Sequence, residues 1–542
     1  MSLLHFDRFA GANLALHPLL IPAGVGVACW NQRPGRGDLR PWKAPATVAT
    51  VAAGRTTIYR MGRSAINDAL YWLAWSADVD VARGMLPGDA VERTFWTGDT
   101  QPKWTDSSIG LSATPYPTSS GVRLLGVLPP NMTPTLSETV AGDGLDESRA
   151  YVVTWVNDRA EESAPSAAAT ITTKPGATIR VTRNATIPSG AHGLTTWRVY
   201  RTVAGAEGDY LYVGEATAAT ATLNTTDSMV NPAISLESED WDYPPAGLQG
   251  IKAMWNGIHG AFKGKDLYFS EPFRPHAWPE KYRVPLDDDI VAIARWRSNL
   301  LALTRGRPYL VTGSTPDGML PQPIEVEQTC VSKRGVVEFG HGVCWPSRDG
   351  LNYIGDGGYR MVTAGRALQS DWLALAPDTL VAGRYEGLYV GSYNPGGGGR
   401  KSIIIDPLAA VGEPSGLYFC DSGFTACHVD DLADALYVLN GTSVQKWESG
   451  AALTASFDSR TERLSRPESM AWGQVVASAY PVTLSVWSDG VAVVSALSVA
   501  NGKPFRLPRG FRGSEWKIRI ATAGAVQAVA LAGSIQELKM VP

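Results

Sequence analysis

The chain has 542 residues, which at roughly 100–200 residues per domain predicts roughly three to five domains and excludes a small disulfide-stapled module. Charged residues make up 18% of the chain and the formal net charge is −4, so the composition encodes no general attraction to nucleic acid or anionic membranes. A hydrophobic content of 44% with a mean hydropathy of −0.08 is typical of a folded soluble chain. The 56 Gly, 36 Pro, 18 Trp and 19 Tyr indicate many turns and β-structure.

The first 45 residues are expected to form an N-terminal arm or platform. Their apolar stretch, Leu19–Trp30, is interrupted by Pro22, Gly24 and Gly26 and follows no basic segment, so we expect no signal peptide. No window reaches the roughly 18 apolar residues of a membrane helix, so we expect no membrane insertion.

The cysteines are odd in number and widely spaced, which fits neither a disulfide framework nor a CxxC zinc pattern. They are Cys29, Cys330, Cys344, Cys420 and Cys427. Their spacing predicts assembly in a reducing compartment.

Helical periodicity is confined to Arg63–Leu70 and Leu368–Leu375, and the rest of the chain consists of short runs of Val, Ile, Tyr, Trp and Thr that end at turn residues. The predicted fold class is therefore all-β. We expect strands at Thr56–Arg60, Tyr71–Trp75, Arg93–Trp96, Tyr151–Asn157, Trp197–Thr202, Tyr210–Glu215, Asp266–Ser270, Asn299–Thr304, Tyr309–Thr312, Leu388–Tyr393, Ser402–Asp406, Ala435–Asn440, Val482–Ser488 and Trp516–Ala521.

Residues 146–228 differ in composition from their surroundings, being rich in Thr and Ala, and they follow a loose stretch at 128–144. They contain about six predicted strands with turns every 8–15 residues, which predicts a small inserted β-sandwich. The phrases "YVVTWVNDRAEESAPSA" and "WRVYRTVAGAEGDYLYVGE" resemble a fibronectin type III domain over about 80 residues. Such modules are spacers or binders.

Residues 241–451 repeat a Leu-Tyr type strand followed by a Gly turn and another strand. The repeated leucines, Leu267, Leu300, Leu351, Leu388 and Leu436, are spaced by 33, 51, 37 and 48 residues, close to the roughly 40–50 residues of one four-stranded propeller blade. The segment predicts a degenerate β-propeller, with an irregular array of β-sandwiches as the alternative. WD40 repeats are disfavoured because Gly340-His341 lacks the closing Trp-Asp.

A propeller needs a closing strand from the other end of the chain. The β-region at 46–130 has the same pattern of short strands and turns as the later repeats, so we expect it to contribute a blade. Residues 452–542 predict a further C-terminal β-region, with additional strands near Gln474–Ala479 and Gln527–Leu531.

A search for catalytic and cofactor motifs predicts no catalytic, cofactor-binding or metal-binding residue. GxSxG and HExxH are absent. Gly264-Lys265-Asp266 lacks the first glycine and the Ser/Thr of a P-loop, and Gly24-Val25-Gly26 has Cys29 where a dinucleotide motif needs its third glycine.

Four further motifs each have an ordinary structural interpretation. Cys427-His428 beside Asp430-Asp431 is the only mixed cluster, but neighbours on a strand point to opposite faces. Asp287-Asp288-Asp289 lacks EF-hand spacing and predicts a solvated turn. Ser347-Arg348-Asp349-Gly350 partly matches the Asp-box of sialidase propellers, and Arg36-Gly37-Asp38 is a chance tripeptide. The protein is expected not to be an enzyme.

Aromatic and proline-rich phrases carry a more specific signal. They are "YWLAWSADVDVARG", "RTFWTGDTQPKWTD", "LLGVLPPN" and "LYFSEPFRPHAWPEKYRVPLDDDIVAI", together with "FRLPRGFRGSEWKIRI" near the C-terminus. The residues concerned are Trp72, Trp75, Asp78, Asp80, Arg93, Thr97-Gly98-Asp99, Pro102, Gly126, Pro129-Pro130, Ser270-Glu271-Pro272, His276, Trp278 and Pro279. These phrases resemble the nozzle or hub proteins at the end of short bacteriophage tails, the tail tubular protein B-like family, over about 400 residues.

The resemblance implies a structural virion protein that forms a ring, typically of six copies, prolongs the tail and conducts the genome. It implies contacts with adaptor or portal-side tail proteins and tail fibres, and passage of phage DNA without sequence-specific binding. A slightly acidic chain suits such a conduit because it does not retain DNA. Exposed Trp, Tyr and Pro are expected at subunit contacts. The alternatives are a glycan-binding or glycan-cleaving propeller that acts as a receptor-binding tail protein, and a host scaffold propeller.

Overall fold

The computed structural model describes residues 3–62, 66–188, 192–203, 208–409 and 415–539. The fold is all-β as predicted, with 45% strand and 5% helix distributed over many small sheets. The chain divides into two compact units. The terminal unit comprises Met1–Trp72, Leu303–Pro308 and Glu325–Pro542, and the central unit comprises Leu73–Ala302 and Tyr309–Ile324. No helix among the described residues is long and apolar enough to cross a membrane.

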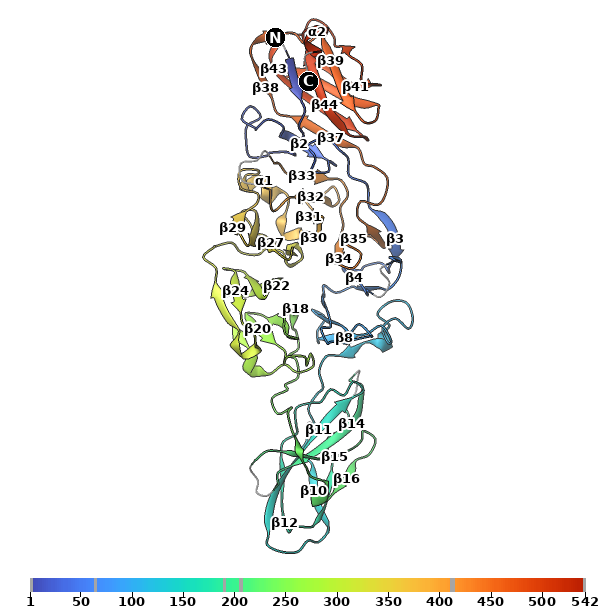
Figure 1. The fold of residues 1–542 in the computed structure, drawn as a ribbon, viewed down its shortest axis with the longest axis vertical. Coiled ribbons are helices and arrows are strands. Elements are labelled where there is room, and N and C mark those ends of the chain that lie inside the picture. Colours follow the sequence, from blue (N-terminus) through green and yellow to red (C-terminus); the bar gives the residue numbers. More distant parts are fainter. Residues whose placement is uncertain (1–2, 63–65, 189–191, 204–207, 410–414, 540–542) are drawn as a thin grey trace. The chain divides into compact units, whose positions relative to one another are not determined.

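The terminal unit contains three consecutive groups of antiparallel strands (Figure 1). The first group is β26 (Val337–Glu338), β27 (Gly342–Pro346), β28 (Leu351–Gly355) and β29 (Gly358–Met361). The second is β30 (Val381–Tyr385), β31 (Leu388–Tyr393), β32 (Lys401–Ile405) and β33 (Tyr418–Cys420). The third is β34 (Ala426–Asp430), β35 (Ala435–Asn440) and β36 (Ser443–Lys446).

Strands from the N-terminal part of the chain complete the sheets of its C-terminal part. β1 (Leu3–Phe6) pairs with β44 (Val526–Ala532), and β2 (Gly26–Trp30) pairs with β37 (Ala455–Ser459). β3 (Ala46–Thr50) pairs antiparallel with β36 and becomes the fourth strand of the sheet β3-β36-β35-β34. Because an unpaired strand leaves its backbone N–H and C=O groups open to other chains, these pairings protect three edges inside one unit.

The last part of the terminal unit, here called the C-terminal module, contains two sheets over one apolar core. One sheet has the order β1-β44-β39-β42. The other, β37-β43-β40-β41 with β38 beside β43, is one end of a ten-stranded sheet that continues from β37 through β2 to β33, β32, β31 and β30. Val475, Leu484, Ile520 and Val529 from both sheets are fully buried in the shared core. The remaining elements are β38 (Glu462–Glu468), β39 (Trp472–Ala477), β40 (Val482–Ser488), β41 (Val491–Val499), β42 (Phe505–Arg506), β43 (Gly513–Thr522) and α2 (Ile535–Leu538).

The central unit contains three four-stranded antiparallel sheets. The first consists of β6 (Asp80–Arg83), β7 (Thr94–Thr97), β8 (Lys103–Thr105) and β9 (Arg123–Leu124). The second consists of β18 (Gln249–Ala253), β19 (His259–Lys263), β20 (Asp266–Phe269) and β21 (Val284–Pro285). The third consists of β22 (Ile290–Trp296), β23 (Asn299–Thr304), β24 (Tyr309–Thr312) and β25 (Leu320–Pro323).

Between the first and second of these sheets in sequence lies a two-sheet module, residues 135–235. A three-stranded sheet of order β10-β13-β16 and a five-stranded sheet of order β12-β11-β14-β15-β17 enclose a core with Trp155 and Trp197 at its centre. Alternation builds this core: in TIRVT, Ile179 and Val181 point inward and Arg180 outward. The strands are β10 (Thr135–Val140), β11 (Glu147–Asn157), β12 (Ala169–Thr173), β13 (Thr178–Thr182), β14 (Leu194–Arg201), β15 (Leu211–Thr217), β16 (Thr222–Thr225) and β17 (Asn231–Ser235).

Short elements connect the sheets. The predicted helix at Leu368–Leu375 is confirmed as α1 (Gln369–Ala374). The remaining short strands are β4 (Thr57–Arg60) and β5 (Trp72–Trp75). Single 3-10 turns occupy Ser119–Gly121, Asp227–Met229, Glu280–Tyr282, Pro316–Gly318, Lys333–Gly335 and Pro377–Thr379.

The other predicted helix, Arg63–Leu70, is wrong for the part that is described, because residues 66–70 form bends and turns; residues 63–65 lie outside the described residues. The physical reason is local. The side chain of Asn67 accepts a hydrogen bond from the backbone N–H of Ala69 at 3.1 Å, and the Trp72 indole donates to the carbonyl of Asp68 at 2.7 Å. An Asn side chain offers the backbone such an alternative to helical hydrogen bonds, and the Trp72 indole occupies the Asp68 carbonyl.

Candidate functional site at the base of the two-sheet module

The one mixed cluster of the sequence, around Cys427, is used for structure. Asp430 forms a buried ion pair with Arg60 at 2.7 Å, and Asp431 pairs with Arg384. The Cys427 thiol donates to the carbonyl of Ala382 at 3.1 Å. His428 lies between aromatic rings, and burial lowers its pKa to about 4. Within the described ranges, no three His, Cys, Asp or Glu side chains are grouped as a metal site requires.

The Asp-box-like motif also has a structural role, at the turn between β27 and β28. The Ser347 N–H donates to the carbonyl of Gly350 at 2.8 Å, and Gln328 and Gln369 both donate to the Asp349 carboxylate. A Cβ at Gly350 would lie 2.1 Å from the Thr363 hydroxyl, so only glycine fits this turn.

The remaining flagged motifs are turns. Gly264-Lys265 connects β19 to β20, and the exposed Asp287 accepts a hydrogen bond from the Tyr309 hydroxyl at 2.7 Å. Arg36-Gly37-Asp38 lies in a bend where the Asp38 carboxylate pairs with Arg40.

The expectation of exposed tryptophans is wrong. All 18 tryptophans are among the described residues, and none of them is exposed: twelve are buried and six are partly buried. The reason is energetic, since a tryptophan side chain can remove roughly 150–250 Å² of surface from water and therefore dominates the core it joins. The tryptophans of this chain hold its small sheets together.

The segments on either side of the two-sheet module in sequence meet in the central unit. The N–H of Ile251 donates to the Thr97 hydroxyl at 3.0 Å, and the N–H of Gly250 donates to the Asp80 carboxylate at 2.8 Å. Gly98 donates its N–H to the carbonyl of Leu248 at 3.0 Å. The side chains that share the apolar core beneath these contacts include Phe95, Trp104, Leu125, Leu248 and Trp278.

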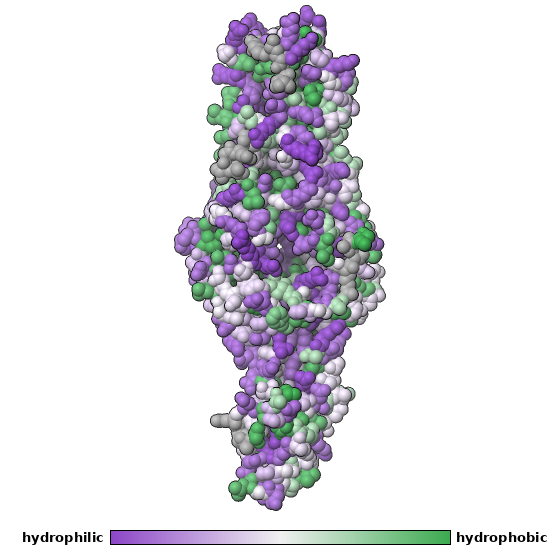
Figure 2. Space-filling model, viewed as in Figure 1, coloured by the Kyte–Doolittle hydropathy of each residue, from purple (hydrophilic) through white to green (hydrophobic). Residues whose placement is uncertain are grey.

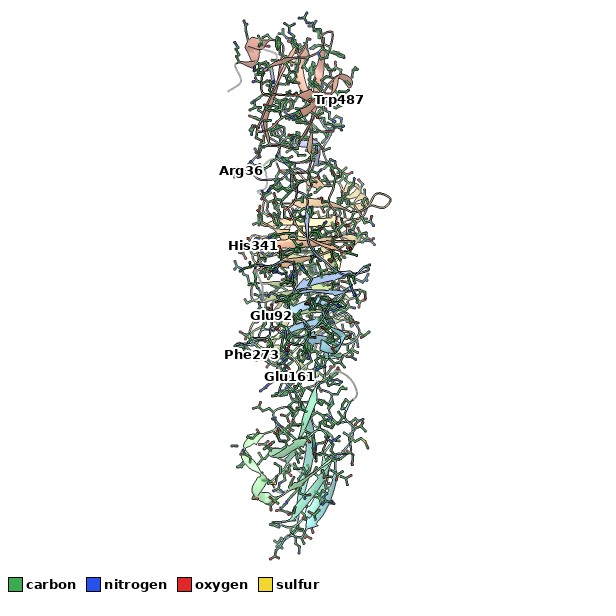
Figure 3. All side chains as sticks on the ribbon, turned by 90° about the vertical axis from the view of Figure 1, so that its right-hand side faces the viewer. Arg36, Glu92, Glu161, Phe273, His341 and Trp487 are labelled. Carbon is green, nitrogen blue, oxygen red and sulfur yellow. The ribbon has the colours of Figure 1, made fainter. Side chains whose placement is uncertain are left out.

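A charged cluster, here called the junction, lies at the base of the two-sheet module. Arg93, which precedes β7, donates to the Glu161 carboxylate at 2.8 Å, and both side chains are only 7% exposed. Asn157 at the end of β11 donates to the other oxygen of the same carboxylate at 2.7 Å. The Nδ1 atom of His276 lies 3.6 Å from Glu161. Glu161 is labelled in Figure 3 at this end of the module, with Glu92, the neighbour of Arg93, on the same unit.

The loop that carries Glu161 is held in one conformation. The Asn157 side-chain oxygen accepts hydrogen bonds from the N–H groups of Arg159 and Glu161, each at 2.9 Å. Ala160 has a φ of 59°, the left-handed conformation that such a tight turn requires. Glu161 therefore reaches Arg93 from a preorganised turn.

Aromatic contacts complete the junction. The Arg93 guanidinium lies 4.2 Å from the centroid of the buried Trp104 ring. Arg159 pairs with the fully buried Asp106 and approaches the same ring at 5.8 Å. An arginine over an aromatic face gains a cation–π interaction that strengthens when it is shielded from water.

Burial governs the protonation states here. Burial would by itself raise the pKa of Glu161, but the charge of Arg93 and the hydrogen bonds from Arg93 and Asn157 hold that pKa below its usual value. Burial lowers the pKa of His276 and of the neighbouring His259 to about 4, and the positive charge of Arg93 adds to both effects. At neutral pH the junction thus contains a charged Arg93–Glu161 pair beside neutral imidazoles.

The junction fixes the position of the two-sheet module on the sheet that contains β7. A buried ion pair tolerates little displacement, because either charge left without its partner costs several kcal/mol. Sequence analysis identified Arg93 and His276 through the phrases that contain them, but it missed Asn157 and Glu161. The only available signal was the polar run "NDRAEE", which has the composition of an ordinary solvated turn.

Comparison with protein-family models found no match, and comparison with curated proteins found none either. Among solved structures, YCF48 from Cyanidioschyzon merolae has a TM-score of 0.27 and 10% identity, covering 74% of this chain and 98% of that one. The RRP9 WD40 repeats have a TM-score of 0.26 and 8% identity, covering 57% of this chain and 99% of that one. PorZ of Porphyromonas gingivalis has a TM-score of 0.25 and 10% identity, covering 86% of this chain and 77% of that one. With every TM-score far below 0.5, the fold rests on the strand pairing of this chain itself.

Proposed function

We propose that the protein is a structural subunit of a bacteriophage short-tail nozzle or hub, a ring of about six copies that forms the distal conduit for genome ejection. The observation that carries the proposal is the junction. Two sequence phrases that resemble this family flank the two-sheet module, and their residues Arg93 and His276 converge on Glu161 at its base. A ring subunit requires modules of fixed orientation, and a buried ion pair on a preorganised turn supplies one.

We also propose that the four-stranded sheets are blades of a degenerate β-propeller and that the two-sheet module is a fibronectin type III-like insert. Support for blades comes from the successive antiparallel sheets and from β3, which completes the sheet of β34, β35 and β36 from the other end of the chain. Support for the insert comes from its two sheets and its core around Trp155 and Trp197.

In this proposal the protein belongs to the virion tail, assembles in the host cytoplasm and has no catalytic role. It contacts itself in the ring, adaptor or portal-side tail proteins above the ring, and tail fibres. DNA passes through without sequence-specific binding, which agrees with the formal net charge of −4. On the visible face of the molecule, hydrophilic and hydrophobic residues are interspersed (Figure 2).

The test is the assembly state of the purified full chain. Negative-stain microscopy and mass photometry at micromolar concentration should show closed rings of about six subunits. A strictly monomeric protein overturns the proposal. Incubation with capsule polysaccharide tests the alternative, since release of reducing ends would identify a glycan-cleaving protein instead.

A further inference from the structure

Three of the seven histidines of the chain lie at the base of the two-sheet module. His192 belongs to the module, in the turn before β14, whereas His259 at the start of β19 and His276 after β20 belong to the part of the unit on which the module stands. Their exposed fractions are 3%, 2% and 5%, so all three are buried. Histidine is the side chain whose charge ordinarily changes between pH 5 and 8.

The two histidines beneath the module lack the partners that a protonated ring needs. Among the described residues, neither ring nitrogen of His259 or His276 has a hydrogen-bond partner. His259 packs against the ring of Phe95, with 5.1 Å between centroids, and His276 packs against Trp241 of the connecting segment at 5.4 Å. Such surroundings favour the neutral imidazole, because a buried charge without a partner is strongly unfavourable.

The charges that act on these rings are mostly positive. Arg93 acts on both rings, and Arg274 acts on His276 from its own loop. Among the described residues that act on the two rings, Glu161 is the one carboxylate, and it already accepts a hydrogen bond from Arg93 at 2.8 Å. A proton on His276, 3.6 Å from Glu161, would compete with Arg93 for this carboxylate, and a proton on His259 would face Arg93.

His192 contacts the two chain segments that connect the module to the sheets. It hydrogen-bonds the backbone of Gly126 in the entering segment, and its ring lies 6.2 Å from that of Tyr243 in the leaving segment. A Cβ at Gly126 would lie 2.9 Å from the Tyr243 ring and 3.1 Å from the carbonyl oxygen of His276. Burial lowers the pKa of His192 and raises that of Tyr243, so both rings are neutral at pH 7.

We propose that the junction is a proton-operated switch, closed while His192, His259 and His276 are neutral and opened when these rings take up protons, which releases the two-sheet module from the sheets beneath it. Clusters of histidine at contacts between structural elements respond to pH in this way. The core around Trp155 and Trp197 lies between the two sheets of the module itself, so the module leaves as a folded body.

The neutral rings set the direction of the pH effect. The pKa of His259 and of His276 is about 4 in the closed form against about 6.5 for a solvated ring, so the open form binds protons more tightly. The closed form is therefore fully favoured above pH ~6.5 and loses ground as the pH falls toward 4. Between pH 7.5 and pH 5, each of these two rings shifts the equilibrium toward the open form by about 30-fold.

The test is hydrogen–deuterium exchange of the full chain at pH 7.5 and pH 5, followed by mass spectrometry and corrected for the intrinsic pH dependence of amide exchange. The peptide around Trp278 reports the junction, because the Trp278 N–H donates to the carbonyl of Asp242 in the leaving segment at 2.9 Å. The peptide around Trp155 reports the core of the module. Protection around Trp278 should fall by about 100-fold or more at pH 5 and protection around Trp155 should not.

Two variants identify the proton sites. His276→Gln and, independently, His259→Gln should each reduce the ratio of protection between the two pH values by about tenfold or more. This ratio is the readout, because a substitution that only loosens packing lowers protection at both pH values alike. His428→Gln is the matched control: His428 is a buried histidine of the terminal unit with a pKa of about 4, and its loss should leave the ratio around Trp278 unchanged.

Three outcomes overturn the proposal. The first is unchanged protection around Trp278 at pH 5. The second is a loss that the Trp155 peptide shares, which would be acid unfolding of the module. The third is a ratio in both glutamine variants equal to that of the unsubstituted chain. None of them decides ring formation, because exchange at the junction is measured within one chain.

Discussion

Arg93 and Glu161 are 68 residues apart in the chain, yet the guanidinium of one donates to the carboxylate of the other at 2.8 Å in a buried site. Arg93 borders a four-stranded sheet, and Glu161 is on the loop after β11 of the two-sheet module. The pair therefore couples the folding of the module to that of the sheet on which it stands.

We expect Glu161→Ala to destabilise the protein by about 3–5 kcal/mol, because the variant leaves the Arg93 charge buried without its partner. The measurement is urea unfolding followed by tryptophan fluorescence. The control is Glu237→Ala, which removes an exposed partner of Arg274 in the same unit and should change stability by less than about 1 kcal/mol. Equal effects of the two substitutions would show that the junction does not stabilise the unit.

A double variant separates the charge from the packing. Replacing both members, Arg93→Met with Glu161→Leu, removes the buried charges together and should recover much of the stability lost by Glu161→Ala. Unfolding of the double variant under the same conditions measures the recovery. If the double variant is as unstable as the sum of its single substitutions, the two residues act independently and the pair is not coupled.

Acidification should lower the melting temperature well before the carboxylates are protonated. The pKa values of His259, His276 and His428 are about 4 in the folded protein, below the usual value of about 6.5, because these rings are buried. The unfolded chain binds protons that the folded chain cannot, so the stability is fully present above pH ~6.5 and falls as the pH approaches 4. Glu161 adds to the loss only at lower pH, as the pH falls through its depressed folded pKa.

Differential scanning calorimetry between pH 7 and pH 4.5 measures this dependence. His276→Gln, which cannot take up the proton, should flatten the fall. An unchanged slope in this variant would mean that His276 does not contribute to the pH dependence.

Removal of residues 3–50 should cause aggregation, because β36, β37 and β44 would each lose a strand partner and expose a backbone edge. Size-exclusion chromatography with light scattering measures the outcome. The control is deletion of Gly397 and Gly398 from the exposed loop after β31, where a Cβ added to either residue would meet no other group within 4 Å, and this deletion should leave a well-behaved protein. A truncated protein that stays soluble and folded would contradict the structural role of the three N-terminal strands.

The five cysteines should resist modification in the native state. Burial raises the pKa of all of them, to about 12 for Cys330 and Cys427 and to about 11 for Cys420. The thiolate is the reactive form, so at pH 8 a disulfide reagent such as DTNB should titrate fewer than one thiol in the native protein. In guanidinium chloride it should titrate five. Rapid reaction of a native thiol would contradict the burial of Cys29, Cys330, Cys344 and Cys420 or the partial burial of Cys427.

Local sequence was sufficient to predict the bounds of a strand wherever that strand is a continuous apolar run between turn residues. The predicted bounds Leu388–Tyr393 and Ala435–Asn440 coincide with β31 and β35, because both runs are buried along almost their whole length. Local sequence failed at Arg63–Leu70, where the Asn67 side chain accepts from the Ala69 N–H and the Trp72 indole donates to the Asp68 carbonyl. The prediction of exposed tryptophans also failed, because composition alone does not tell which aromatic side chains face solvent.

The amino-acid sequence by itself determined the all-β class, the positions of the sixteen strands predicted above and the resemblance carried by phrases around Arg93 and His276, because these depend on neighbours within a few residues. Only the tertiary structure decided which distant strands pair, such as β3 with β36, and which partners meet at the junction. Glu161 looks like any charged turn residue until folding places it against Arg93. The physical reason is that a charged side chain on a turn is solvated unless folding buries it, and a buried charge requires a partner of opposite charge. Burial is a property of the folded chain.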